Sequence, residues 1–176
     1  MPGAGSTQDH EMVPYEYEDR DTGREALRRA LALLTDLDPR VREHGADEVG
    51  DCLRRCAGDQ DDTEVATARL VALTVAETDE RVRESALNAC AHAATTYVIP
   101  LAVFQPLAPL LPNLSAELTG YVLLILGLTH DPAARPIITP YLNHPEASVR
   151  LEASDALTEL SARRPTIIHP DVSPTS

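Results

Sequence analysis

Apolar side chains recur at intervals of three and four residues along most of the chain, a period that predicts helices rather than strands. Positions 26, 27, 30, 31 and 34, for example, are all Ala or Leu and would share one helical face. The pattern predicts eight helical segments in four consecutive pairs. They are 24–34, 39–56, 63–77, 80–95, 100–111, 116–129, 133–142 and 145–163.

Residues that favour the first position of a helix precede several of these segments. Asp38, Asp79 and Ser115 are predicted to cap the second, fourth and sixth segments through their side-chain oxygens. Asp62 or Thr63 is predicted to cap the third segment, after a loop that includes 59–62. These caps divide the chain into units with similar second helices.

Two segments depart from this regularity. Prolines interrupt the fifth segment, and each one removes a backbone hydrogen bond, so we expect a short, kinked or broken helix there. In the last segment Glu146 occupies the position of the other caps. We therefore expect that helix to begin earlier, at Pro145.

A short phrase recurs in the second helix of three pairs. It reads DPRVREHGA at 38–46, TDERVRESA at 78–86 and HPEASVRLEA at 144–153. Each copy has a Val-Arg pair and a small residue four positions after the valine, on the same helical face. Leu118 takes the valine position in the third pair by spacing alone, so the inner anchors are predicted to be Val41, Val82, Leu118 and Val149. Repetition at intervals of 41, 36 and 31 residues is typical of stacked helical units.

These residues resemble HEAT repeats, whose signature of Asp, Val-Arg, Ala and Leu is matched best by Val149-Arg150-Ala153-Leu157. The resemblance covers about 24–163. It implies an all-α fold, an α-α superhelix (solenoid) of about four helical hairpins. It also implies structural roles, linking adjacent units, for Asp38, Arg42, Asp79, Arg83 and Arg150. We expect a flexible acidic tail at 1–22, a repeat domain at 23–164 and a second flexible tail at 165–176.

Composition refines the picture of the core and of the partner. Only 3% of residues are aromatic, so the core must be aliphatic, and the nearly uncharged stretch 97–128 is expected to be either interior or a dimer face. The net charge of −13 opposes binding to nucleic acid and favours encounter with a basic protein. No secretory signal or membrane span is visible, so a cytoplasmic protein is expected, with its oligomeric state left open.

Motifs for catalysis are missing from the sequence. There is no His-Glu-x-x-His run, nucleophile elbow or phosphate-binding loop, and no lysine at all, so we expect neither an enzyme nor a cofactor. Cys52, Cys56 and Cys90 are a conceivable zinc set, but small buried thiols explain them more simply and no metal is expected. Of HEAT-like enzymes, DNA glycosylases are disfavoured by the acidity, whereas phycobilin lyases lack a diagnostic residue here.

The candidate binding surface lies along the second helices, at positions two, six and ten after each anchor, which share one outward face. The candidate residues, together with Gly120, are Glu43, Asp47, Asp51, Glu84, Asn88, His92, Leu124, Leu128, Leu151, Asp155 and Glu159. This acidic stripe with an apolar zone predicts non-catalytic binding of a basic protein. The most specific interpretation is a bacterial immunity protein that masks a basic toxin. The alternative is an adaptor or assembly factor in a multiprotein complex, and a third hypothesis is a phycobilin-lyase-like protein.

Overall fold

The computed structural model describes residues 15–55 and 59–162, and all regular structure in these ranges is helical. The α-helices are α1 (Tyr15–Leu33), α2 (Pro39–Arg54), α3 (Gln60–Ala76), α4 (Glu80–Thr96), α5 (Leu101–Phe104), α6 (Ala116–Leu128), α7 (Arg135–Ile138) and α8 (Ala147–Ser161). Three 3-10 helices complete the set: η1 (Gln105–Asn113), η2 (Pro132–Ala134) and η3 (Thr139–Asn143). The all-α prediction is therefore confirmed for the described residues.

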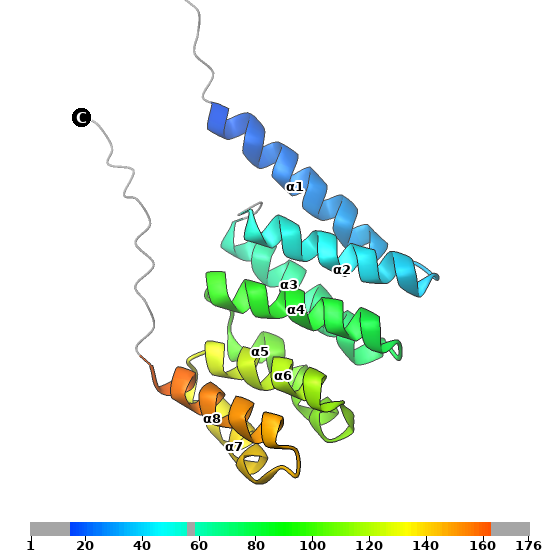
Figure 1. The fold of residues 1–176 in the computed structure, drawn as a ribbon. Helices are drawn as coiled ribbons and strands as arrows, with labels where there is room; N and C mark the ends of the chain where they lie inside the picture. The colour runs from blue at the N-terminus through cyan, green and yellow to red at the C-terminus, as the bar shows by residue number, and fades with distance from the viewer. Residues whose placement is uncertain (1–14, 56–58, 163–176) are drawn as a thin grey trace, which may run out of the picture.

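The helices form two layers (Figure 1). In the first layer α2, α4, α6 and α8 lie side by side in chain order. The second layer contains α3, α5 with η1, and α7 with η3, each packed against the first layer. Helix α1 covers α2 at the N-terminal end. Residues far apart in sequence thus meet along one continuous row of long helices.

Glycines let neighbouring helices of the row approach closely at two equivalent places. A Cβ added at Gly50 would lie 3.1 Å from the Cβ of Ala89, at the contact between α2 and α4. A Cβ added at Gly127 would lie 2.7 Å from the backbone oxygen of Ala156, at the contact between α6 and α8. The contact between α4 and α6 is less extensive. The row is therefore two tight pairs joined across a looser middle.

The stretch 97–128 supplies large apolar side chains to the core, although many of its other residues are exposed. Phe104, Leu107 and Leu111 are buried under α3 and α6, and α6 buries residues on almost every side. Aliphatic side chains close-packed in this way supply most of the folding free energy. The prolines break the fifth segment as expected, because it is four residues of α-helix followed by a 3-10 helix.

Three of the four predicted anchors are fully inside. Val82 and Val149 are 0% exposed and Leu118 is 2% exposed. The expectation for Val41 was wrong, since its side chain is only half-buried. Helix α2 is the first of its row, so α1 alone covers the side that faces away from α4.

The helix ends agree with the predicted caps in three cases and differ in two. Asp38, Asp79 and Ser115 accept hydrogen bonds from the first backbone N–H groups of α2, α4 and α6. For α3 the prediction of Asp62 or Thr63 was wrong: Asp59 is the cap. The acidic residues read as a loop form the first turn of α3, where the helix dipole favours negative charge.

The start of α8 is the second difference at the helix ends. It begins at Ala147 after Glu146, and not earlier at Pro145. Glu146 has an extended backbone like the other caps but makes no side-chain capping bond. The repeat spacing, which puts the cap at Glu146, therefore located the start of α8 correctly. The poor capping ability of glutamate, which favoured an earlier start, was misleading.

The expected N-terminal tail, 1–22, is also too long. Helix α1 already begins at Tyr15, inside the expected tail. Residues 1–14 and the predicted tail at 165–176 lie outside the described residues.

In α2 and in α8, an arginine side chain donates hydrogen bonds to backbone carbonyl oxygens of the turn that precedes the helix. The guanidinium of Arg42 donates to the carbonyl oxygens of Asp36 and Leu37, at 2.8 and 3.0 Å. Arg150 donates in the same way to His144 and Pro145, both at 2.7 Å. The two sets of acceptors stand six and five residues before their arginine, so the first and last units share this local geometry.

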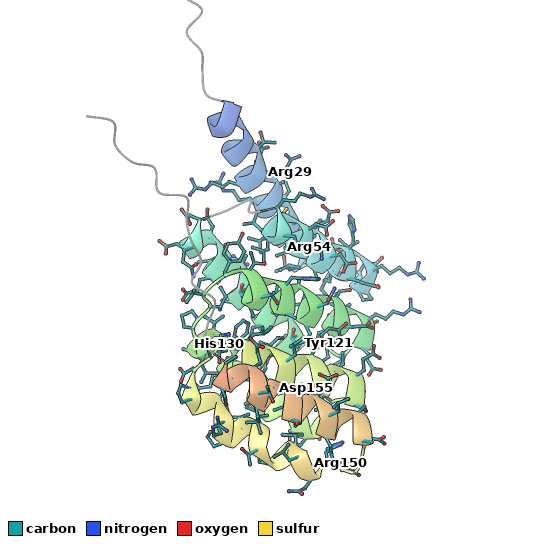
Figure 2. All side chains as sticks on the ribbon, turned by 60° about the vertical axis from the view of Figure 1, so that its left-hand side comes forward. Arg29, Arg54, Tyr121, His130, Arg150 and Asp155 are labelled. Carbon is teal, nitrogen blue, oxygen red and sulfur yellow. The ribbon has the colours of Figure 1, made fainter. Side chains whose placement is uncertain are left out.

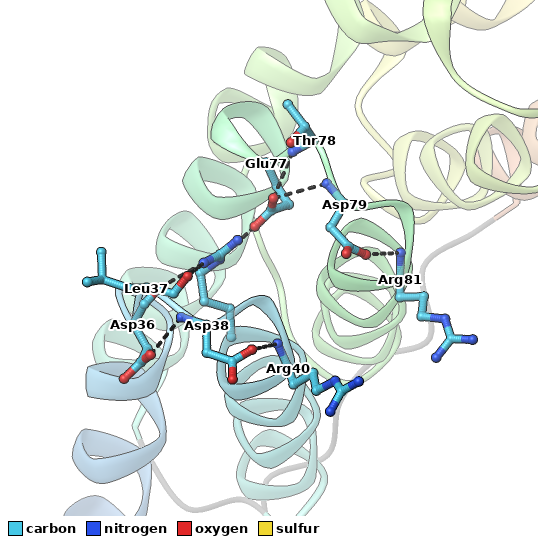
Figure 3. Close-up of polar contacts among 9 residues, drawn as sticks. Asp36, Leu37, Asp38, Arg40, Glu77, Thr78, Asp79 and Arg81 are labelled. Carbon is cyan, nitrogen blue, oxygen red and sulfur yellow. Dashed lines mark hydrogen bonds and ion pairs between the residues drawn. The ribbon is translucent and has the colours of Figure 1, made fainter.

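Arg42 also joins the first unit to the second through Glu77, which Figure 3 shows beside Thr78 and Asp79. Its Nε lies 2.7 Å from the Glu77 carboxylate, which is buried at the end of α3 and also accepts from the N–H groups of Thr78 and Asp79. These donors hold the pKa of Glu77 at about 2, chiefly through the Arg42 hydrogen bond and against the effect of burial. Arg42 therefore has the linking role that the resemblance implied.

Arg83 does not show the same arrangement. Its Nε is buried without a hydrogen-bond partner, although it stands at the position equivalent to Arg42. The turn that would have to supply a carboxylate like Glu77 is the end of η1, which has Asn113 and Leu114 instead. The linking role implied for Arg83 is therefore not seen at that atom.

Candidate functional site

The predicted binding residues lie on the solvent-facing side of the α2–α4–α6–α8 row, here called the row face. All eleven are exposed or half-buried, whereas Gly120 is buried. Figure 2 shows Tyr121 near the middle of this face and Asp155 on the neighbouring α8. Four helices separated widely in sequence thus contribute to one surface.

Two adjoining hollows in the row face share Tyr121, and together they are called the Tyr121 groove. The smaller, of about 240 Å³, spans α2, α4 and α6 and is lined by Glu43, Arg81, Glu84, Ser85, Asn88 and Tyr121. The larger, of about 500 Å³, lies between α6 and α8 and is lined by Ala116, Glu117, Gly120, Tyr121, Leu124, Ser148 and Glu152. The groove is shallow and open, which suits contact with a surface or a chain segment better than enclosure of a small molecule.

Backbone packing explains why the surface is hollowed here. The looser contact between α4 and α6 leaves room beside Tyr121 for the smaller hollow. In the larger hollow Gly120 presents no side chain, and a Cβ there would lie 3.3 Å from the Cγ of Glu152. The shape therefore follows from two local features of α6.

The structure brings four of the predicted residues into the groove. Glu43, Glu84 and Asn88 line the smaller hollow, and Leu124 lines the larger one. Sequence reasoning missed the aromatic centre, Tyr121, and the other lining residues: Arg81, Ser85, Ala116, Glu117, Ser148 and Glu152. Most of these stand one position before or three after an anchor, on the flanks of the predicted face, so a wider helical sector would have included them.

The residues predicted at position ten are engaged elsewhere. Asp51 pairs with Arg54 and Arg55 on its own helix. Glu159 lies 3.4 Å from the Nε2 of His130, and Leu128 packs on the core. Burial, aided by the charge of Arg54, lowers the pKa of His92 and favours its neutral form. These four residues lie toward the C-terminal ends of their helices and outside the groove.

Asp47, Asp155 and Leu151 are exposed on the same row but line neither hollow. Leu151 is 61% exposed, one of the most exposed large apolar side chains in the described part of the chain. These residues could touch a partner only beyond the rim of the groove. The structure therefore separates the predicted set into residues that line the groove, exposed residues beyond its rim, and residues near the helix C-termini that lie outside the groove.

Negative charge concentrates around Tyr121. Burial raises the pKa of its phenol, and the carboxylates of Glu84 and Glu117 raise it further. The hydroxyl thus stays protonated, and the ring presents an electron-rich face within a field that attracts cations. Arg81 lines the smaller hollow as well, but its side chain is exposed and makes no ion pair in the described ranges.

The cysteines of the described ranges are core residues. Cys52 and Cys90 are buried as free thiols, and burial raises the pKa of each, so they are held protonated rather than as metal-binding thiolates. Cys56 falls outside the described residues. Over 15–55 and 59–162 no three His, Cys, Asp or Glu residues are grouped as a metal site would need. In the same ranges, none of the helices has the length and apolar character needed to cross a bilayer.

Comparison with known proteins adds information on the fold alone. No protein-family model matches the sequence, and no curated protein matches it. The crystal structure of an engineered protein is similar, with a TM-score of 0.56 and 18% identity over 76% of this chain. This chain spans 62% of that protein's length. At this identity the likeness supports a shared helical fold and carries no statement about function.

Proposed function

We propose that the two layers are a short α-α solenoid of four HEAT-like helical pairs. Three observations support this arrangement. Val82, Leu118 and Val149 are buried at equivalent positions. Arg42 and Arg150 each donate to carbonyl oxygens six and five residues earlier in the chain. The glycine contacts of α2 with α4 and of α6 with α8 also recur in the same register.

For such a protein we propose a non-catalytic function: the row face binds another protein that carries a basic surface. The observation that carries the proposal is a set of four carboxylates, one from each row helix, that line the Tyr121 groove. They are Glu43, Glu84, Glu117 and Glu152. Within the described ranges none of them is in an ion pair. A basic partner would supply the missing counter-charges, and Leu124 with Leu151 would add apolar contact.

The biological setting that fits best is that of a bacterial immunity protein in the cytoplasm, which covers the basic active surface of a toxin. The chain's net charge of −13 supports this, because a cover for a nucleic-acid-binding surface must compete with a polyanion. An adaptor in a multiprotein complex would use the same face. Gene neighbourhood distinguishes the two settings. A toxin gene directly upstream favours the immunity protein, whereas neighbouring genes for the subunits of a complex favour the adaptor.

Charge reversal at the rim tests the binding face. We expect Asp47→Arg with Asp155→Arg to weaken binding of the captured partner about tenfold at low salt, because both substitutions place repulsive charge beside a basic surface. The partner is captured with the wild-type chain from native extract, identified by mass spectrometry and titrated with each variant. The control pair, Glu48→Arg with Glu64→Arg, changes the charge equally at two positions outside the predicted binding residues, and Glu64 belongs to α3 in the second layer. Equal weakening by both pairs, or by neither, would refute the proposed face.

A further inference from the structure

The four carboxylates of the Tyr121 groove contrast with the acids that serve as ion-pair partners elsewhere in the structure. Glu77 pairs with Arg42, and Asp59 and Asp62 pair with Arg24. Glu43, Glu84 and Glu152, by comparison, are half-buried in the groove and make no ion pair within the described ranges. A cationic ligand in the groove would therefore meet carboxylates that make no ion pair within the described ranges.

The centre of the groove is aromatic and its far side is partly apolar. Tyr121 is the one residue that lines both hollows, so any chain segment lying along the groove must pass its side chain. Beyond it, Ala116, Gly120 and Leu124 give the larger hollow an apolar floor next to Glu117 and Glu152. The groove thus combines an aromatic residue, carboxylates and a small apolar surface.

Among basic side chains, arginine matches this combination better than lysine. Its planar guanidinium stacks on aromatic faces and donates two parallel hydrogen bonds to a carboxylate, whereas the lysine ammonium is a compact, strongly hydrated charge. Its aliphatic stem can also cover apolar surface while the head remains among carboxylates. The stacking contact would be made with the ring of Tyr121.

Resting on the proposed function, we propose that the Tyr121 groove is the specificity subsite of the row face and receives arginine side chains from a segment of the basic partner. One guanidinium lies over the Tyr121 ring within reach of Glu84 and Glu117. The neighbouring part of the segment lies along Gly120 and Leu124 toward Glu152. Arg81, exposed and unpaired in the described ranges, moves aside when the segment binds.

The test uses the full chain and two peptide probes of equal charge, end-blocked hexa-arginine and hexa-lysine, titrated by calorimetry at low salt. We expect hexa-arginine to bind more tightly. Tyr121→Leu should weaken hexa-arginine binding roughly two- to fivefold and abolish the preference over hexa-lysine, since it removes the cation–π contact. Tyr121→Phe keeps the ring and should keep the preference. Tyr141→Leu is the matched control, because Tyr141 is also half-buried but lies outside the groove.

A second readout does not depend on the packing of Tyr121. Glu84→Gln with Glu152→Gln should weaken hexa-arginine binding several-fold more than Glu48→Gln with Glu64→Gln, which removes the same charge elsewhere. Thermal unfolding of each variant confirms that the chain remains folded.

The outcomes separate this inference from the proposed function. If the peptides bind equally well, or if groove and control variants behave alike while the Asp47→Arg, Asp155→Arg pair still weakens partner binding, the arginine subsite is wrong and the row face stands. If neither peptide binds and the rim reversal also has no effect, both the subsite and the proposed function are wrong.

Discussion

We expect Gly127→Ala to lower the free energy of unfolding by up to about 2 kcal/mol, although alanine is the better helix former. A Cβ at this position would lie 2.7 Å from the Ala156 oxygen and 2.9 Å from the Ala156 Cα. Both atoms belong to the backbone of α8, so α6 and α8 must move apart. Overpacking of this kind costs about 1–3 kcal/mol, which exceeds the gain of about 1 kcal/mol in helix propensity.

Gly120→Ala, in the same helix, is the matched control. The nearest obstacle to its Cβ is the Cγ of Glu152 at 3.3 Å, part of a flexible side chain that can rotate away. The propensity gain then dominates, and stability should rise by up to about 1 kcal/mol. Urea unfolding of both variants measures the difference. Equal effects of the two substitutions, in either direction, would contradict the close approach of α6 and α8.

The second large effect is expected at Glu77. Replacing it with Gln should cost about 3 kcal/mol near neutral pH, because Arg42 loses its partner and two backbone N–H groups lose a charged acceptor. Arg24→Met is the control that breaks an ion pair on the surface. Arg24 is 41% exposed, so solvent screens its ion pairs and its loss should cost much less than the loss of Glu77. If the two variants lose comparable free energy of unfolding, the buried Glu77–Arg42 pair contributes no more to stability than an exposed pair does.

The same carboxylate predicts a pH dependence of defined sign. Its pKa is lowered in the folded chain from 4.5 to about 2, so the contribution of Glu77 is complete above about 4.5 and is lost as pH falls toward about 2. Wild-type stability should therefore fall more steeply across this window than that of Glu77→Gln, by about 3 kcal/mol in total. Parallel pH profiles of urea unfolding for the two proteins would contradict this.

Most of the helical order could be read from the sequence, because apolar period and caps act locally. Asp38, Asp79 and Ser115 fix helix starts within a few residues of chain, and the structure agrees. The misplaced start of α3 arose where several acids compete for one cap, a choice that propensity alone does not settle. The half-buried Val41 depended on which helices neighbour α2, which is a property of the whole stack.

The candidate site was predictable as a face but not as a shape. Helical spacing assigned Glu43, Glu84 and Leu124 to one side of the row, and all three line the Tyr121 groove. It could not reveal that α4 and α6 pack less extensively than their neighbours, which creates the smaller hollow around Tyr121. Nor could it reveal that Asp51 and Glu159 are paired within the chain.

The most direct test of the row face as the binding surface is amide NMR of the 19.1 kDa chain with and without its captured partner. The account predicts that the largest chemical-shift changes fall in α4, α6 and α8 around Glu84, Tyr121 and Glu152. Changes centred instead on the second layer, at the exposed side of α3 with Val65 and Val75, would contradict it.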